Sequence, residues 1–184
     1  MNNTVYLVST SSLKDYSIIN SNVADELLSN AILEAQEVDL QQILGSKLYK
    51  KIIELVKTNT IDTETDYKYL LDEYCIKVII YAATSRSAVY AHYKIMNKGT
   101  QVQNSDNSNP VSIAELEYLR DEIKNTLEFF EKRLQDFLIT NKDLYPEFEY
   151  CSCCGELNPQ KSVYRTSLVI PNYRVPKYNY NDVK

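Results

Sequence analysis

The segment from Asp66 to Met96 constrains the fold of this chain most, because it is the longest apolar stretch that contains neither glycine nor proline. Its apolar side chains recur mostly every three or four residues, which is the period of one side of an α-helix. These positions are Leu70, Leu71, Tyr74, Cys75, Val78, Ile79, Tyr81, Ala82, Val89, Tyr90 and Tyr93. At about 1.5 Å per residue, such a helix is roughly 45 Å long. We therefore expect other helices to pack along it and cover its apolar side.

Short polar motifs mark both ends of this long helix. Thr63 precedes Asp66 by three residues and is suited to cap the start. The sequence Asn97-Lys98-Gly99 supplies a cation and then a glycine, which is typical of a helix end. Among residues 100–109 only Val102 is aliphatic, and a proline follows. This composition predicts a mobile loop after the helix.

Two helices are expected before the long one. Ser21 and Asn22 are suited to cap the first, and its apolar spacing continues as far as Gly45. Gly45 and the serine after it are expected to break the helix. A second helix then reaches about Lys57.

A further helix is expected after the loop. Ser112 and Glu115 have the spacing of a capping box, in which each side chain binds the backbone N–H of the other. From Ile113 a narrow apolar stripe runs at steps of three and four residues to near Asn141. This amphipathic helix is expected to lie against the long helix.

The placement of proline separates a helical body from two arms. Residues 1–109 contain no proline, whereas four of the five prolines lie in the C-terminal part. The sequence predicts a mainly α fold, a small antiparallel helical bundle around one long central helix, for residues 21–141. Residues 1–20 are expected to form an extended N-terminal arm, and residues 142–184 an extended or β C-terminal arm.

Each arm contains one strand-like stretch, Val5 to Val8 in the first and Val163 to Ile170 in the second. An extended segment cannot satisfy its backbone groups alone, so the second stretch must add to a sheet edge, wrap the body or join another chain. Residues 160–184 carry five basic side chains against one acidic one, a net charge of +4. The rest of the chain therefore carries −9 of the total of −5. A basic arm on an acidic body is suited to dock on an acidic partner, including a second copy.

Tyrosine supplies most of the aromatic side chains of the arm, and its flat apolar body with a polar tip suits interfaces. We take eight aromatic and basic residues of the arm as the candidate assembly interface. They are Tyr150, Tyr164, Arg165, Tyr173, Arg174, Lys177, Tyr178 and Tyr180.

One cluster of soft metal ligands is present, formed by Cys151, Cys153 and Cys154. Structural zinc usually takes four ligands in two pairs, and this chain offers no second pair beside it. Cys75 and His92 are the remaining soft ligands, and both belong to the long helix. We expect reduced cysteines in a turn and no metal site.

Motifs for catalysis are not found. His92 is the only histidine, and the nucleophile motifs that would accompany a catalytic base are missing, as are phosphate and dinucleotide loops. Acidic residues such as Glu34, Glu37 and Asp39 are expected to form solvated helix faces. The expectation is a protein that is not an enzyme and has no cofactor. No apolar run is long enough to span a bilayer, which favours a soluble protein made in a cytoplasm.

The segment from Ala31 to Ile53 places two apolar stripes on either side of a glycine corner. The pattern consists of Ala31-Ile32, Ala35-Gln36, Asp39-Leu40, Ile43-Leu44-Gly45 and Leu48-Tyr49. It resembles the opening helices of the small helical head-tail connector (adaptor) proteins of tailed phages, particularly those of crAss-like and related Bacteroidota phages. The similarity continues more loosely through a long apolar helix, a polar loop and a last amphipathic helix, and covers roughly residues 20–140.

This resemblance implies a structural virion protein at the head-tail junction, assembled in the host cytoplasm. Such proteins form a homo-oligomeric ring, commonly of twelve copies, between the portal protein and the next tail or connector ring protein. Genomic DNA passes through the channel of the ring without specific binding, which accords with an acidic body that repels phosphates. If the arm from Tyr145 carries the assembly contacts, a chain cut at Asn141 should stay a folded monomer. The alternative is a free-standing helical adaptor that binds a single protein partner through its C-terminal tail.

Overall fold

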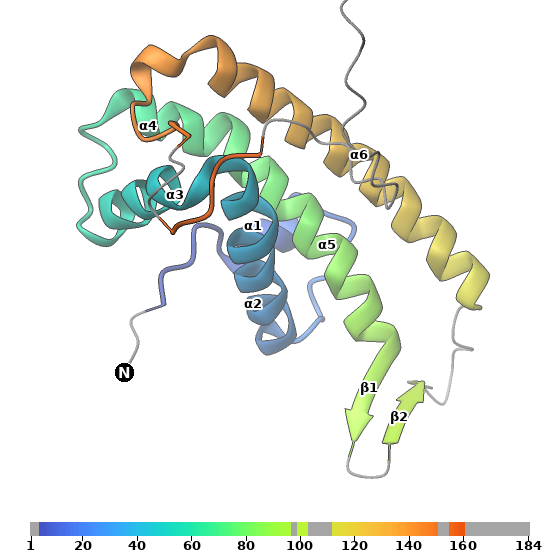
Figure 1. Ribbon diagram of the computed structural model, residues 1–184. Coiled ribbons are helices and arrows are strands. Elements are labelled where there is room, and N and C mark those ends of the chain that lie inside the picture. Colours follow the sequence, from blue (N-terminus) through green and yellow to red (C-terminus); the bar gives the residue numbers. More distant parts are fainter. Residues whose placement is uncertain (1–3, 97–98, 103–111, 151–154, 161–184) are drawn as a thin grey trace, which may run out of the picture.

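The computed structural model describes residues 4–96, 99–102, 112–150 and 155–160. Within these residues the chain is mainly helical and forms a bundle, as the sequence predicts (Figure 1). The helical elements are α1 (Thr10–Asp15), α2 (Asp25–Glu34), η1 (Ala35–Leu40), α3 (Gln41–Lys57), α4 (Thr65–Leu70), η2 (Leu71–Cys75), α5 (Ile76–His92), α6 (Ile113–Thr140) and η3 (Lys142–Leu144). Of these, η1 and η2 are π-helical and η3 is a 3-10 turn.

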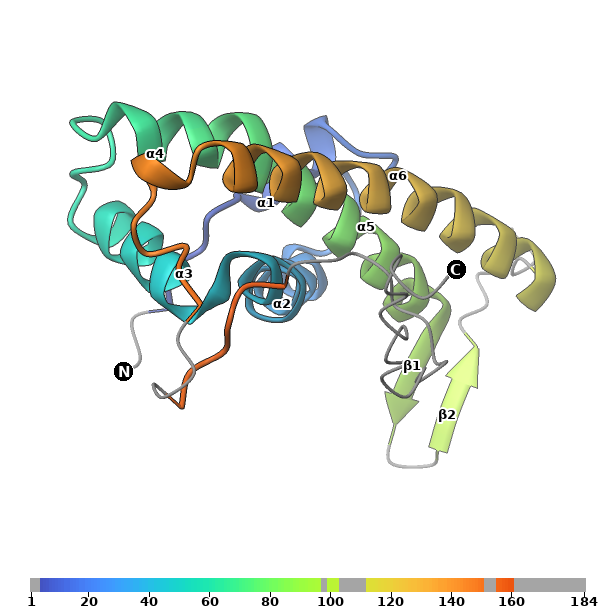
Figure 2. The same cartoon turned by 45° about the horizontal axis from the view of Figure 1, so that its top comes forward.

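The long central helix consists of α4, η2 and α5, which follow one another directly. Helix α6 lies along it in both views of the ribbon (Figures 1 and 2). Near the start of α6, Ile113 lines a pocket with Val89 from the end of α5. Near the end of α6, the ring of Phe137 stacks on that of Tyr74 at 4.2 Å between centroids. The two helices are therefore antiparallel, and the predicted packing is confirmed.

The central helix ends earlier than predicted. It stops at His92, and β1 (Tyr93–Met96) pairs in antiparallel fashion with β2 (Gly99–Val102). The predicted helix end at Met96 and the predicted loop over residues 100–102 are therefore wrong; residues 103–109 lie outside the described part. Pairing between the two strands outweighs the helical pattern here, because aromatic and β-branched residues fit a paired strand as well as a helix. The hairpin projects beyond the end of α5 (Figures 1 and 2).

The capping predictions differ in outcome. The Ser112 and Glu115 capping box is confirmed, with the Glu115 N–H donating to Ser112 Oγ at 3.3 Å and the Ser112 N–H to Glu115 Oε2 at 2.9 Å. The caps predicted at Ser21-Asn22 and Thr63 are wrong. Helix α2 begins after Ala24 and α4 after Glu64, and neither residue gives a side-chain cap.

The N-terminal arm is more ordered than predicted. Residues 10–15 form helix α1 in place of an extended segment, and no strand forms over Val5 to Val8. A buried glutamine of η1 holds the backbone of this stretch instead. Gln36 Oε1 accepts from the Leu7 N–H at 3.2 Å, and Gln36 Nε2 donates to the Val5 carbonyl at 2.8 Å.

The first part of the predicted C-terminal arm belongs to the core. Tyr145 and Phe148 are buried, and the Tyr145 hydroxyl donates to the Asp66 carbonyl at 2.9 Å. The ring of Tyr145 meets that of Tyr67 edge-on at 5.6 Å between centroids. The body therefore extends past residue 141, because these aromatic side chains cover the start of the central helix. The strand predicted at Val163 to Ile170 lies outside the described residues.

Candidate functional site

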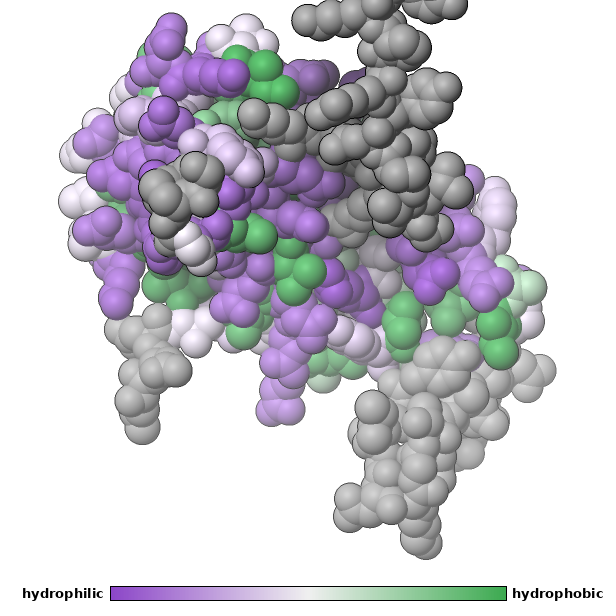
Figure 3. Space-filling view, in the orientation of Figure 1, coloured by the Kyte–Doolittle hydropathy of each residue, from purple (hydrophilic) through white to green (hydrophobic). Residues whose placement is uncertain are grey.

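The end of the body from which the hairpin projects exposes an apolar surface, which we call the hairpin-end surface. Val89 at the end of α5 and Ile113 and Leu116 on the first turn of α6 line a pocket there with Glu117 and Arg120. Leu119, on the next turn of α6, is also exposed, and we include it with these three apolar residues in the hairpin-end surface. Ile113 is 61% exposed and Leu119 is 40% exposed. Figure 3 shows apolar residues gathered where the body meets the hairpin. This is the kind of patch that marks a protein contact.

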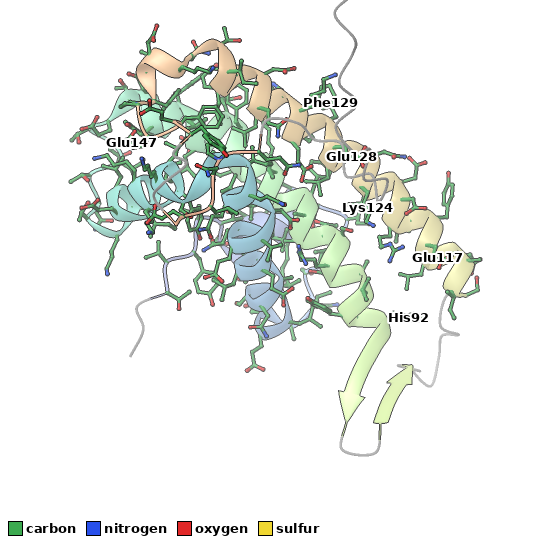
Figure 4. All side chains as sticks on the ribbon, in the orientation of Figure 1. His92, Glu117, Lys124, Glu128, Phe129 and Glu147 are labelled. Atoms are coloured by element: carbon green, nitrogen blue, oxygen red, sulfur yellow. The ribbon has the colours of Figure 1, made fainter. Side chains whose placement is uncertain are left out.

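The early end of α5 explains why this part of α6 is only partly covered. The apolar stripe of α6 runs its full length, but α5 turns into the hairpin at His92. The last turns of α5 reach the first turns of α6 at Val89, but leave Ile113 and Leu119 exposed. Figure 4 shows His92 and Glu117 at this end of the molecule, on α5 and α6 respectively. The unburied part of the stripe is therefore a direct result of the hairpin.

A cavity of about 480 Å³ lies between α5, α6 and η1. Its charged lining is balanced, with three acidic and three basic side chains. They are Asp39, Glu128, Glu131, Arg86, Arg120 and Lys124. Lys124 and Glu128 lie on α6 in Figure 4. A lining of mixed charge suits a polar protein segment better than a nucleic-acid phosphate, which requires a positive excess.

A salt-bridge network at one wall of the cavity joins α2 and η1 to α5. Arg86 donates to Asp39 Oδ2 from two nitrogens, at 2.6 and 3.2 Å, and lies 3.5 Å from Glu34 Oε2. The Tyr90 hydroxyl also donates to Glu34. Burial lowers the pKa of Arg86, but the hydrogen bonds and charges of Asp39 and Glu34 raise it above its ordinary value.

This network corrects the prediction that Glu34, Glu37 and Asp39 form a solvated face. Only Glu37 is fully exposed, whereas the side chain of Asp39 is 5% exposed. The π-helical turn of η1 shifts the residues out of the regular 3.6 period and directs Asp39 and Gln36 inward. The Arg86 contact is a long-range one that the periodicity of the sequence does not indicate.

The chain after α6 returns to the body at the glycine corner. Gly45 has φ of 76° and ψ of 161°, and Pro159 lies where a Cβ of residue 45 would be, with its Cδ 2.8 Å away. The Ser46 N–H donates to the Leu157 carbonyl at 2.9 Å. The break predicted at Gly45 is confirmed. The packing of Pro159 against Gly45 was not predicted from the sequence.

Gln160 is held on both sides at the point where the described residues end. Its N–H donates to the Gln42 carbonyl at 3.0 Å, and its carbonyl accepts from Gln135 Nε2 of α6 at 2.9 Å. Gln160, the last described residue, is therefore fixed beside α6.

Of the predicted interface residues, the structure describes only Tyr150, which is 59% exposed. The other seven lie outside the described residues: Tyr164, Arg165, Tyr173, Arg174, Lys177, Tyr178 and Tyr180. Cys151, Cys153 and Cys154 also lie outside them.

The remaining soft ligands do not form a cluster. Cys75 is buried in the central helix, and burial raises the pKa of its thiol. His92 ends α5. In the described part of the chain, no three side chains of His, Cys, Asp or Glu come together as metal ligands would. A search of the same residues finds no helix with the length and apolarity that a bilayer crossing requires.

The architecture is a helical bundle with a projecting hairpin and an exposed apolar end. Residues 40–157 match a family of unknown function, DUF6712, and the chain belongs to this family. The matched region begins in η1 and ends within the segment that docks on the glycine corner. No curated protein and no solved structure matches the chain.

Proposed function

We propose that this chain is the subunit of a ring in the head-tail connector of a tailed phage, bound to the portal protein on one side and to the next tail or connector ring on the other. The proposal starts from the resemblance of residues 31–53 to connector proteins. The observation that carries it is the hairpin-end surface, where an apolar stripe of α6 is exposed beside a projecting hairpin. A neighbouring subunit supplies the cover that α5 does not.

The contact in a ring is heterologous, so the hairpin-end surface meets a different surface on the next copy. Burial of apolar side chains at that contact stabilises the ring by roughly 25 cal/mol per Å² removed from water. The acidic body fits a channel through which DNA passes without binding, since like charges repel the phosphates.

Two substitutions of equal chemistry on α6 test this surface. Leu119→Glu places a charge in the hairpin-end surface, whereas Ile139→Glu places the same charge at a site of similar exposure near the far end of the helix, 44% against 40%. We expect Leu119→Glu to weaken self-association at least about tenfold, because burying an unpaired charge is costly. Ile139→Glu should leave it unchanged. Sedimentation velocity of the full chain, alone and with a portal ring, measures both.

The structure also changes where the C-terminal arm should be cut. A cut at Asn141 removes the buried Tyr145 and Phe148, so a folded monomer is no longer the expected product. A cut after Gln160 keeps every core contact of this segment and removes only the basic tail.

Equal association of both glutamate variants would contradict the role of the hairpin-end surface. A complex of one chain with one partner, formed through the tail and without rings at any concentration, would favour the single-partner adaptor.

A further inference from the structure

We propose that the β1–β2 hairpin is completed by a third strand, residues 163–170 of a neighbouring copy of this chain. The inference rests on the proposed function, because it requires a second copy, and it names the contact by which one copy holds the next. Three observations carry it: the two-stranded hairpin, the strand-like sequence of residues 163–170 and the fixed position of Gln160, the last described residue before them.

The hairpin is an incomplete sheet. In the described part of the chain β1 and β2 pair only with each other, and both project from the body (Figure 1). A two-stranded hairpin is marginally stable alone in water, and a third strand is what normally makes such a sheet stable. Each outer edge presents unpaired N–H and C=O groups that an extended segment is able to bind.

The register identifies these groups. Met96 pairs with Gly99 across a two-residue connection, and pairs in an antiparallel ladder alternate between bonded and non-bonded. Ile95 and Thr100 therefore form a non-bonded pair, whose backbone groups point away from the hairpin. The backbone groups of Ile95 therefore face outward at the edge of β1, and those of Thr100 face outward at the edge of β2.

The strand that fits is present in the same chain. Residues 163–170 read Val-Tyr-Arg-Thr-Ser-Leu-Val-Ile, rich in β-branched and aromatic side chains and followed by a proline. The described body offers no other strand to which this segment can be added. The hairpin edge is thus the one described place where its backbone groups find the partners they need.

The geometry of the two long helices keeps most of this segment away from the hairpin of the same copy. Gln160 is bonded to Gln135 of α6. Tyr81 of α5 stacks on Phe130 of the antiparallel α6, and from this contact Gln135 lies five residues along α6 in one direction, whereas the hairpin begins 12 residues along α5 in the other. The separation along the helices is therefore 17 residues, or about 26 Å at 1.5 Å per residue. An extended chain covers at most about 3.3–3.6 Å per residue, so at least about seven residues after Gln160 are needed to reach that hairpin. The whole of residues 163–170 therefore lies along a hairpin only if the hairpin belongs to another copy.

Cross-linking between full-length chains tests this. One chain carries Thr100→Cys or Ile95→Cys, and a differently tagged chain carries Ser167→Cys; in both, Cys151, Cys153 and Cys154 are changed to Ser. The native Cys75 is buried and does not react. With a short bismaleimide we expect a mixed dimer from at least one of the two edge positions.

Proline in the tail supplies the specific control. Thr166→Pro with Val169→Pro removes N–H donors from both sides of the strand and should reduce the mixed dimer at least about tenfold. The matched alanine pair, Thr166→Ala with Val169→Ala, keeps these donors and should preserve it. Both pairs of substitutions lie outside the described residues.

The pairing is refuted by the absence of a mixed dimer at either edge, by equal yields from the proline and alanine pairs, or by a chain carrying both cysteines that links to itself at high dilution. Electron microscopy of the same samples separates this from the proposed function. Rings that form without the cross-link would support the proposed ring and refute the strand pairing. A cross-link that forms without rings would support the strand pairing and contradict the proposed ring.

Discussion

Replacing Gly45 by alanine is the sharpest test of how the C-terminal segment is held. At φ of 76° and ψ of 161° the backbone lies in a region that is essentially restricted to glycine, where another residue costs about 1–3 kcal/mol. The new Cβ would also lie 2.8 Å from Pro159 Cδ and 2.9 Å from its nitrogen. Relieving such overpacking typically costs about 1–3 kcal/mol more.

The expected loss must be corrected for the unfolded chain, which alanine stiffens by about 0.4–1 kcal/mol relative to glycine. Together these effects predict a decrease of about 1–5.5 kcal/mol in the free energy of unfolding. Urea unfolding followed by circular dichroism measures this decrease. Because the clash acts on Pro159, the chain after Leu157 should also become more susceptible to proteolysis.

Gly155 provides the matched control. It also has a positive φ, of 61°, but nothing lies within 4 Å of its ideal Cβ position. Gly155→Ala therefore meets backbone strain alone and should destabilise the protein by about 1 kcal/mol or less after the same correction. Equal effects of the two substitutions would refute the claim that Pro159 occupies the glycine corner.

Three further substitutions test the polar contacts of the body. Asp39→Asn should lower the free energy of unfolding by about 2–4 kcal/mol, because it leaves Arg86 without its buried carboxylate. Glu34→Gln, at the half-exposed side of the same network, should change it by less than about 1 kcal/mol in chemical denaturation. Burial raises the pKa of Tyr145 and Tyr49 to about 12, whereas tyrosine in the unfolded chain ionises near pH 10. Their contribution to stability is therefore full below about pH 10 and is lost as the pH rises towards 12. Tyr145→Phe should lower the free energy of unfolding by about 1 kcal/mol at neutral pH. Because phenylalanine does not ionise, the free energy of unfolding of this variant should decrease less between pH 10 and 12 than that of the unchanged chain.

What the sequence could predict is what local interactions decide. The capping box of Ser112 and Glu115 spans four residues, and the break at Gly45 follows from glycine itself. The apolar stripe of α6 requires only a helical period, and its packing on the central helix follows from the need to bury that stripe. These features could be placed without knowledge of the rest of the chain.

What it could not predict depends on distant partners. The central helix gives way to β1 because Tyr93–Met96 finds a strand, and helical periodicity carries no information about that pairing. Asp39 turns inward because η1 departs from the 3.6 period to meet Arg86. Pro159 packs against Gly45, which lies 114 residues earlier in the chain. No local sequence pattern predicts a contact over such a separation.

The candidate site shows the same division. The sequence predicts that the basic tail needs a partner, and the residues of that tail lie outside the described part of the chain. The hairpin-end surface was not predicted, because the central helix was expected to continue to Met96 and to cover the first turns of α6. Ile113 and Leu119 are exposed because the central helix stops at His92.

Native mass spectrometry of the purified full-length chain, alone and after incubation with a portal ring, tests the central claim most directly. If the chain forms a connector ring, we expect one closed oligomer of defined copy number on the portal, with an open centre in electron micrographs. A chain that binds as a single copy, or that stays monomeric with the portal present, would contradict it.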